Sequence, residues 1–349
     1  MKICFFGIYN REYSRNDILL TGLKENDVTV FEYNEPANQK WRYFRLIKRL
    51  AGHKDKFDFI FCAYPSPVPT ILASILSRRP IIVDAFYSMY DAVVNDRKQC
   101  GRFSPKALRL LVLDWLSVLV ADIIMVDTIE HKKYWADWLF VKESKIVVVP
   151  NGVNVHKMFP EDILDSKIKK VDVTFHGNYI PLQGVEKIVE AFNILKEEKI
   201  SFRLIGNGQD FKKITKLIDN YGLTDTIDIV GRVDYDVLRN YLNSTKIVMG
   251  IFGDSDKAKR VVPNKVYEGC AVRKVVITMD TEAVRSLYDV DQVVFVEPNP
   301  ESIAISIKSL LNSPTELEKI AAKGYIRTIS DYSPKAIVAD LIKKIENAK

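Results

Sequence analysis

The sequence has few cysteines, and none of them lies in a metal-binding or disulfide pattern. It contains four in 349 residues, with no CxxC pair and no histidine at metal-ligand spacing beside them. Scattered single cysteines argue against a structural zinc and against a disulfide-stapled secreted fold. They are Cys4, Cys62, Cys100 and Cys270. We therefore expect a reduced compartment and no structural metal.

Long apolar runs are also missing. A membrane-spanning helix needs roughly 18 or more apolar residues in a row, and even the apolar stretch 108–126 carries Asp114 and Asp122. The short apolar run after Met1 ends at Gly7, before it reaches the length of a signal-peptide core. We expect a cytoplasmic chain that does not cross a bilayer and that begins with a β-strand.

Biased composition is absent as well. Hydrophobic residues make up 47% of the chain and charged residues 28%, and glycine and proline are scattered. This composition is typical of a soluble globular protein and excludes disordered and fibrous classes. A chain of 349 residues is too long for one ordinary core, so two domains are expected.

What the sequence does contain is an alternation of short β-branched or aromatic runs with amphipathic helical stretches. This alternation predicts repeated βα units and parallel sheets. Six strands are expected in the first half, at 2–6, 28–32, 58–62, 80–84, 122–126 and 145–149. Six more are expected in the second half, at 171–176, 201–205, 226–230, 246–250, 274–278 and 292–296. Each half is therefore expected to be a complete doubly wound α/β unit.

The two halves are separated by a break in this pattern. A Pro-Asn-Gly sequence at 150–152 starts a polar segment that runs through Lys170, after which strands resume. The expected parts are an N-terminal Rossmann-like domain over 1–165, a C-terminal Rossmann-like domain over 166–330, and a terminal helix over 331–349. Ligands of open α/β sheets bind at the carboxyl ends of the strands, so two such domains facing each other predict a cleft that holds the active site.

One segment of the second half has the chemistry of an anion site. Residues 262–268 follow a strand and a loop, and Pro263 and Asn264 are helix-initiation signals. A helix N-terminus offers free N–H groups and partial positive charge to a phosphate, and Lys265 adds a cation in the first turn. Glu268 lies about one turn further, where a carboxylate can accept hydrogen bonds from ribose hydroxyls. Glu268 could equally serve only to support the helix start.

Residues 250–278 resemble the retaining GT-B glycosyltransferases of family 4, also called glycosyl transferases group 1. The resemblance extends over nearly the whole chain through motifs at 150–154, 176–185, 206–208 and 231–233. It implies an α/β GT-B fold with two Rossmann-like domains, an interdomain cleft and a C-terminal helix that packs back on the N-terminal domain. It also implies that the C-terminal domain binds a nucleotide diphosphate sugar.

The resemblance assigns roles to residues of the second half. In that family a glutamate at the position of Glu268 holds the donor ribose, and the basic residue before it, here Lys265, lies near the diphosphate. Glycine after a strand lets a ligand approach the backbone. The expected donor-binding residues are Gly177, Asn178, Gly206, Arg232, Asn264 and Glu268.

The chain departs from the family pattern at three places. Arg260 stands where the family has the first glutamate of a pair, which leaves sugar recognition there without its usual carboxylate. Gln183 stands where many members have a phosphate-binding lysine, and Arg232 or Lys265 is expected to take over that work. Arg273 replaces a glycine and alters a turn. Arg260 either adds charge to the diphosphate site or belongs to a solvated loop.

The resemblance places the acceptor on the N-terminal domain. Gly7 follows the first strand, and Asp84 ends a buried-looking strand shortly before Ser88. Asp84 is either a polar active-site residue or a loop cap that binds backbone N–H groups. His131 is either a ligand or a packing residue. The expected acceptor contacts are Gly7, Ser88 and His131, and the expected catalytic residues are Asp84, Arg260 and Lys265.

Retaining enzymes of this kind are thought to work without a covalent intermediate, with the departing diphosphate helping to deprotonate the acceptor on the same face. The task of the protein is then electrostatic, because donors and cations around the diphosphate lower the barrier as charge grows there. No acid-rich triplet of the DxD kind precedes the donor loops. We therefore expect a metal-independent enzyme without a cofactor.

The expected function is transfer of a sugar from a nucleotide diphosphate sugar to a saccharide or lipid-linked acceptor, in the synthesis of cell-surface polysaccharide or glycoconjugates. A GT-B-fold nucleotide-sugar epimerase and a non-catalytic sugar- or partner-binding module remain alternatives. A nicotinamide-dependent dehydrogenase is disfavoured, because no GxGxxG follows the first strand.

Positive charge is concentrated in residues 40–56. They hold seven Lys or Arg and one Asp, an excess equal to the net charge of the whole chain, +6. One face of a helical wheel carries Tyr43, Phe44, Ile47 and Leu50. Another face carries Trp41 among cations, which suits either a peripheral contact with an anionic membrane or a core-packing helix with a solvated basic face. Nucleic acid is not expected, since no binding signature accompanies the basic segment.

Overall fold

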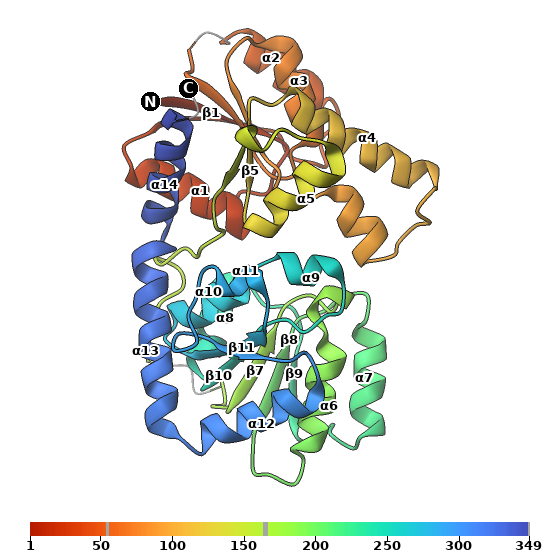
Figure 1. The fold of residues 1–349 in the computed structure, drawn as a ribbon, viewed down its shortest axis with the longest axis vertical. Coiled ribbons are helices and arrows are strands. Elements are labelled where there is room, and N and C mark those ends of the chain that lie inside the picture. The colour runs from red at the N-terminus through yellow and green to blue at the C-terminus, as the bar shows by residue number, and fades with distance from the viewer. Residues whose placement is uncertain (54–55, 163–166, 348–349) are drawn as a thin grey trace. The chain divides into compact units, whose positions relative to one another are not determined.

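The computed structural model describes residues 1–53, 56–162 and 167–347, which fold into two compact units (Figure 1). Unit 1 comprises Met1–Asn154 together with Tyr332–Lys349, and unit 2 comprises Val155–Asp331. The domain boundary expected between residues 165 and 166 lies outside the described residues. Each unit contains one parallel sheet of six strands.

The strands of unit 1 are β1 (Lys2–Gly7), β2 (Thr29–Asn34), β3 (Phe59–Cys62), β4 (Ile81–Asp84), β5 (Ile123–Val126) and β6 (Ile146–Val148). They lie in the order β2-β1-β3-β4-β5-β6. The central strands β3, β4 and β5 are buried throughout, because their apolar side chains face helices on both sides of the sheet. The strand order reverses between β1 and β3, so the carboxyl ends of these two strands flank the switch point of unit 1.

The α-helices of unit 1 are α1 (Ser14–Glu25), α2 (Arg42–Ala51), α3 (Pro67–Leu76), α4 (Pro105–Val120), α5 (Ile129–Leu139) and α14 (Pro334–Asn347). Helix α14, at the end of the chain, packs on α1. Gly22 permits this contact, because a Cβ at that position would lie 2.1 Å from the carbonyl oxygen of Pro334. The Lys344 Nζ donates to the Val148 carbonyl at 2.6 Å. The last helix is therefore an integral part of unit 1.

Helix α2 corrects one detail of the sequence-based prediction. Its buried residues are Leu46 and Leu50, whereas Phe44, predicted on the same face as Leu50, is 61% exposed. Leu46 and Leu50 are four residues apart and so lie on one side of the helix, while Phe44 lies two residues from Leu46 and faces away from it. The helix packs through its leucines, and its aromatic residues remain near solvent.

The strands of unit 2 are β7 (Val173–His176), β8 (Phe202–Ile205), β9 (Ile227–Val230), β10 (Ile247–Met249), β11 (Val275–Met279) and β12 (Val294–Val296). They lie in the order β12-β11-β10-β7-β8-β9. If β7 is numbered as strand 1 and the sheet is followed from β9 to β12, the order is 3-2-1-4-5-6, as in dinucleotide-binding folds. The switch point then lies between β7 and β10. The sequence-based prediction of all twelve strands is confirmed, with ends shifted by no more than two residues.

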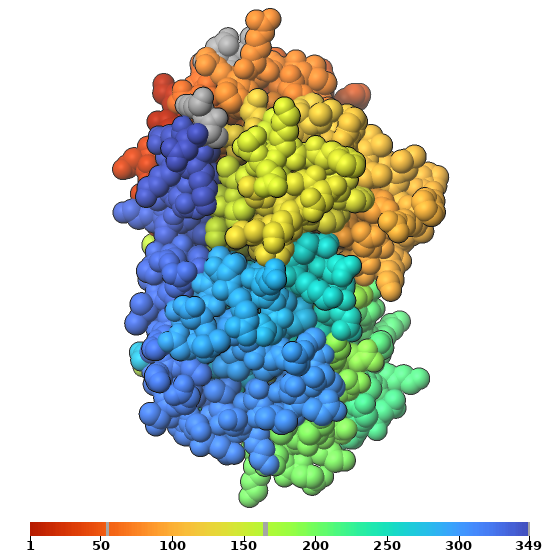
Figure 2. Space-filling view, viewed as in Figure 1, coloured from red at the N-terminus to blue at the C-terminus, as the bar shows by residue number. Residues whose placement is uncertain are grey.

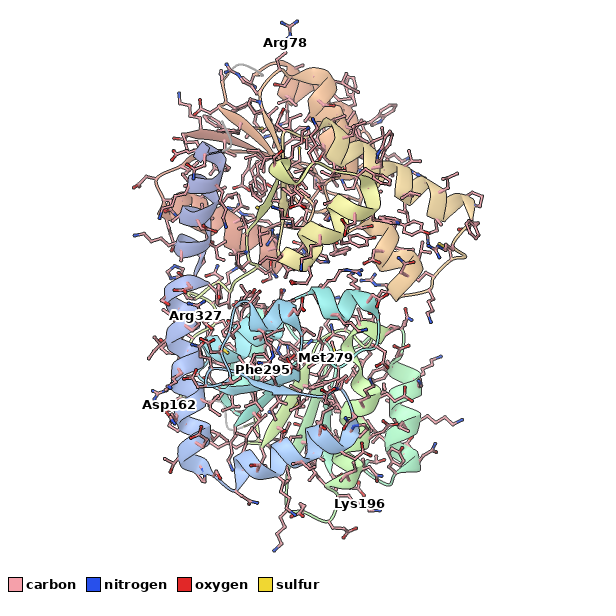
Figure 3. The ribbon with its side chains drawn as sticks, in the orientation of Figure 1. Arg78, Asp162, Lys196, Met279, Phe295 and Arg327 are labelled. Atoms are coloured by element: carbon pink, nitrogen blue, oxygen red, sulfur yellow. The ribbon has the colours of Figure 1, made fainter. Side chains whose placement is uncertain are left out.

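The helices of unit 2 are α6 (Val185–Ile194), α7 (Phe211–Asn220), α8 (Tyr235–Asn243), α9 (Asp256–Arg260), α10 (Asn264–Ala271), α11 (Glu282–Arg285), α12 (Pro300–Leu311) and α13 (Pro314–Asp331). Side chains fill the space between these helices and the sheet, among them the buried Met279 labelled in Figure 3. The stretch before Arg260, for which a solvated loop was one interpretation, is helical because the Ser255 side chain caps it by accepting from Ala258 N. In the part of the chain that the structure describes, no helix combines the length and the apolar character of a membrane span.

Candidate functional site

The loops that follow β7 and β8 in unit 2 are joined through two glycines. Gly177 and Gly206 have φ angles of +142° and +128°. A Cβ on Gly206 would lie 1.9 Å from the carbonyl oxygen of Gly177, whose N–H donates to the Ile205 carbonyl at 3.0 Å. Glycine is required here, because both the backbone conformation and the space exclude a side chain.

The loop after β7 contacts the loop after β10 on its other side. Gly184 has a φ of +63°, and a Cβ there would lie 2.4 Å from the carbonyl carbon of Phe252. Phe252 N donates to the Gln183 carbonyl at 3.0 Å. Three loops therefore meet where the strand order reverses, which is the position at which open α/β sheets bind ligands.

Helix α10 begins at this point, after Pro263, without a side-chain cap. Its first N–H groups and its dipole therefore offer a site to an anion. Lys265, in the first turn, is buried, and its Nζ donates to Gln183 Oε1. The same Nζ lies 4.9 Å from the ring centroid of Phe175 and 3.0 Å from the position a Cβ of Gly177 would take. Folding thus gathers residues from the loop after β7 and from α10 around one ammonium group.

Glu268 and His176 lie next to this ammonium group. Both side chains are buried, and Glu268 Oε2 lies 3.6 Å from His176 Nε2. The His176 Nε2 has no hydrogen-bond partner among the residues that the structure describes. The Tyr235 hydroxyl, from the start of α8, lies near Glu268 and favours its ionised form, which lowers the pKa of that carboxyl. We call Lys265, Glu268, His176, Gln183 and Tyr235 the α10 cluster.

Burial shifts the pKa of three groups in the α10 cluster toward their neutral forms. It raises the pKa of Glu268 to about 7, an effect that Lys265 and the Tyr235 hydroxyl oppose. Burial lowers the pKa of Lys265 to about 7, an effect that Glu268 opposes. Burial, with Lys265 nearby, lowers the pKa of His176 well below its ordinary value. Several perturbed groups in one place are typical of a functional site.

The other predicted donor residues lie around the α10 cluster or further along the sheet. Asn264 is the half-buried first residue of α10, and Asn178 is exposed directly after Gly177. Arg260 is the half-buried last residue of α9. Arg232 is exposed after the edge strand β9, which β8 separates from β7. Arg232 is therefore the predicted residue most distant from the switch point in strand order.

Three members of the α10 cluster were not identified as site residues from the sequence. His176 carries a signal in hindsight, because it ends the strand at the switch point. Gln183 was noted only as a departure from a family pattern, and nothing in the sequence indicates that it contacts Lys265. Tyr235 is brought to Glu268 only by packing of α8. Among the described residues, no group of three or more His, Cys, Asp or Glu side chains is arranged to hold a metal.

In unit 1 the predicted catalytic residue Asp84 belongs to a buried ion pair. Arg15 Nε lies 3.0 Å from both carboxylate oxygens, and both side chains are buried. Arg15 Nη1 also donates to Val149 O and Asn151 Oδ1, each at 3.3 Å. Burial raises the pKa of Asp84, and the Arg15 guanidinium opposes this. This geometry favours an anchoring role, in which Asp84 ties α1 to the sheet.

The predicted acceptor residues of unit 1 also have partners within the protein. Ser88 Oγ donates to Asp114 Oδ2 at 2.7 Å, and burial raises the pKa of Asp114 to about 6. His131 Nδ1 contacts the Asp127 carboxylate at the start of α5. Gly7 ends β1 beside the switch point. A small cavity is lined by Tyr64, Ser66, Asp84, Tyr87, Asp114 and Trp135. The predicted catalytic residue Asp84 is thus among the residues that line this cavity.

The α10 cluster lies within the part of the chain that is similar to a known protein family. Residues 161–327 match the family model of glycosyl transferases group 1. The uncharacterized glycosyltransferase MJ1069 of Methanocaldococcus jannaschii is 33% identical over 106 residues, which are 28% of this chain and 26% of that protein. The uncharacterized glycosyltransferase YqgM of Bacillus subtilis is 21% identical over 242 residues, 66% of this chain and 63% of YqgM. The matched part of the chain therefore covers about a quarter of the length of MJ1069 and less than two thirds of the length of YqgM.

Solved structures resemble the chain over its whole length. Anabaena Alr3699/HepE, in complex with UDP and glucose, has a TM-score of 0.74 at 14% identity, covering 99% of this chain and 100% of that chain. Sucrose-phosphate synthase from Thermosynechococcus elongatus has a TM-score of 0.74 at 14% identity, covering 100% of both chains. The GT-B fold expected from the sequence is confirmed. The chain therefore has the two-domain GT-B fold, and its residues 161–327 match the family model of glycosyl transferases group 1.

Proposed function

We propose that this chain is a retaining, family 4 type glycosyltransferase that moves a sugar from a nucleoside diphosphate donor to a saccharide or lipid-linked acceptor. The observation that carries the proposal is the α10 cluster, in which Lys265 and Glu268 lie buried one turn apart beside the glycine loop after β7. Buried ionisable groups with incomplete partners are costly to a fold, and a bound ligand offsets that cost.

The donor diphosphate is proposed to bind at the start of α10. There the first turn of α10 has no side-chain cap and Lys265 supplies an ammonium group, and a side chain at Gly177 would crowd that group, because its Cβ would lie 3.0 Å from the Nζ. A phosphate oxygen that replaces Gln183 Oε1 gives the Lys265 ammonium a negatively charged acceptor in place of a neutral amide, which makes the hydrogen bond stronger. Arg260 and Arg232 are proposed to add positive charge at longer range.

Glu268 is proposed to hold the ribose of the donor. Its carboxylate lies one turn after Lys265, at a distance along the helix that suits the step from diphosphate to ribose. Hydrogen bonds from two ribose hydroxyls stabilise the ionised form, so donor binding lowers the pKa of Glu268 from about 7. Glu268 then changes from a costly buried acid to a satisfied hydrogen-bond acceptor.

The proposed chemistry places the main catalytic effect at the leaving group. As the glycosidic bond breaks, negative charge grows on the diphosphate, and preorganised N–H groups and Lys265 stabilise it. The acceptor hydroxyl attacks the anomeric carbon on the face that the diphosphate leaves and gives its proton to the departing phosphate oxygen. This scheme needs no side-chain nucleophile and no metal. A role in the synthesis of cell-surface polysaccharide or glycoconjugates is part of the same proposal.

Donor binding is tested by thermal shift with UDP, GDP, ADP and TDP and their sugars. UDP-sugars are the first choice, because Anabaena HepE was crystallised with UDP-glucose. One nucleotide is expected to raise Tm, and K265A and E268Q are expected to abolish that rise. K196A, an exposed lysine of unit 2 (Figure 3), is the matched control and should leave it unchanged. If no nucleotide raises Tm, the proposal is wrong.

Transfer is tested by product analysis with a labelled donor in the presence of EDTA. The label is expected to move to an acceptor, or slowly to water, with its anomeric configuration retained. A changed sugar that stays on the nucleotide would indicate an epimerase, and binding with neither transfer nor hydrolysis would indicate a binding module. Loss of activity with EDTA that magnesium restores would contradict the metal-independent scheme.

A further inference from the structure

Helix α4 of unit 1 presents its apolar side to solvent. Four large apolar side chains on it are between 42% and 60% exposed, namely Leu108, Val112, Trp115 and Leu119. Their spacing places them along one side of the helix. On the buried side the helix carries the polar residues Asp114 and Ser117. The helix therefore leaves a row of apolar side chains in solvent while it buries polar residues beside Ala107 and Val118.

Buried hydrogen bonds hold α4 in this orientation. Asp114 Oδ2 accepts from Ser88 Oγ at 2.7 Å and from Tyr90 N at 2.9 Å. Ala107 and Val118, on the same side, pack into hydrophobic clusters of unit 1. Rotation of the helix to bury its apolar side would break these bonds and expose these contacts. The outward apolar side is thus a built feature of unit 1.

The N-terminal end of this apolar side is positively charged. Phe103, 95% exposed, lies there among the exposed cations Lys98, Arg102, Lys106 and Arg109. No ion pair with the described residues neutralises these four cations. Between positions 97 and 120 the sequence has a single acid, the buried Asp114. We call these four cations, Phe103 and the four apolar residues the α4 surface; its gold-coloured residues form the right-hand edge of unit 1 in Figure 2.

Helix α2, which lies within the positively charged segment 40–56, has fewer unpaired cations. Arg45 Nε lies 2.6 Å from Glu35 Oε2, and Arg49 Nη1 lies 3.5 Å from Glu35 Oε1. Two cations of α2 are therefore partly neutralised within the protein. The α4 surface differs because its cations lack such partners and because its apolar side chains are aligned along more turns.

We propose that the α4 surface docks on an anionic lipid bilayer. Aliphatic and aromatic side chains on one side of a helix enter the headgroup boundary, and the lysines and arginines beside them contact lipid phosphates. A second copy of the chain fits this surface less well, because a two-fold interface brings the same cations against each other. The inference stands independently of the proposed transferase, and docking would bring a lipid-linked acceptor to the protein.

Co-sedimentation of the full chain with vesicles tests the proposal. We expect binding to mixed phosphatidylcholine–phosphatidylglycerol vesicles, weakened by salt, and little binding to phosphatidylcholine alone. L108S/L119S and K106Q/R109Q are each expected to lower binding about tenfold or more. The matched control is I305S/I326S, which removes similarly exposed apolar side chains from unit 2 and should bind as the unmodified chain does.

Trp115 offers a local readout on the same vesicles. W115F is expected to lose the blue shift of tryptophan fluorescence on vesicle addition, whereas W41F, at the start of α2, keeps it. Circular dichroism and Tm check that each variant is folded. The proposal is overturned if L108S/L119S binds vesicles as the control does, or if the chain is a dimer that this variant dissociates and no vesicle binding occurs. Nucleotide binding is measured separately, so failure here leaves the transferase proposal intact.

Discussion

The two units bury a cation and a carboxylate near the carboxyl ends of their strands, but they neutralise them differently. In unit 1 Arg15 meets both oxygens of Asp84 at 3.0 Å. In unit 2 Lys265 donates to the neutral amide of Gln183, and Glu268 has a histidine at 3.6 Å and a pKa raised to about 7. Buried charge alone therefore does not mark a binding site. In the proposed function, the incompletely neutralised charge at the switch point of unit 2 is what a bound ligand completes.

The largest effect that would sharpen this comparison is expected from K265A. Removal of the ammonium at the proposed diphosphate site should lower transfer activity about 100-fold or more. Tm should stay constant or rise, because the buried cation carries a desolvation cost. Steady-state kinetics and thermal unfolding measure the two effects. A large fall in Tm with unchanged nucleotide binding would show that the α10 cluster serves the fold.

D84N should produce the opposite pattern in unit 1. The Arg15 guanidinium would lose its charged partner while buried, which should lower the free energy of unfolding by about 3–5 kcal/mol. Urea denaturation measures the loss, and D254N, in an exposed pair with Lys187, is the control with an expected change below about 0.5 kcal/mol. A variant that stays stable but loses transfer would assign Asp84 the catalytic role expected from the sequence.

A pH series tests whether Glu268 is as strained as the structure indicates. Its pKa is raised from an ordinary 4.5 to about 7, so the folded chain holds a proton that the unfolded chain releases in this window. The stabilisation from this group is present below pH 4.5 and is lost as pH rises through about 7. Relative to E268Q, the unmodified chain should lose about 1–3 kcal/mol of unfolding free energy across this window.

Lys265 gives the pH series an internal check. Its pKa is lowered from 10.5 to about 7, so the unfolded chain binds more protons between these values, and stability should rise with pH there. Urea denaturation of the unmodified chain and of K265A over this pH range provides the comparison, because K265A is expected to lack the rise in stability. Parallel pH curves for the unmodified chain and both variants would refute the pKa shifts of the α10 cluster.

The smallest expected effect belongs to Q183K, which would place a second ammonium beside Lys265. Like charges should lower Tm of the free chain slightly, and nucleotide diphosphate affinity should rise about 3- to 10-fold at low salt. Calorimetry at two salt concentrations measures the gain. Unchanged affinity would place Gln183 outside the diphosphate site and would weaken the contrast between the units.

Much of the fold could be predicted because its signals are local. Strands buried on both faces read as short continuous apolar runs, and proline and asparagine at 263 and 264 indicated the start of α10. The prediction failed where it depended on which side of a helix meets the core. Phe44 of α2 was placed on one face with the buried Leu50 and is exposed, and nothing in the pattern indicated that α4 would turn Trp115 outward. Helix orientation is decided by contacts with distant elements.

By itself, then, the sequence determined the strands, the helix starts and the glycine turns, because backbone sterics and side-chain periodicity act over a few residues. Only the tertiary structure decided which charges are neutralised. Arg15 and Asp84 are 69 residues apart, and Gln183 and Lys265 are 82 apart. The electrostatic environment of a buried group is the sum over all the groups that folding brings near it, and no local pattern contains that sum.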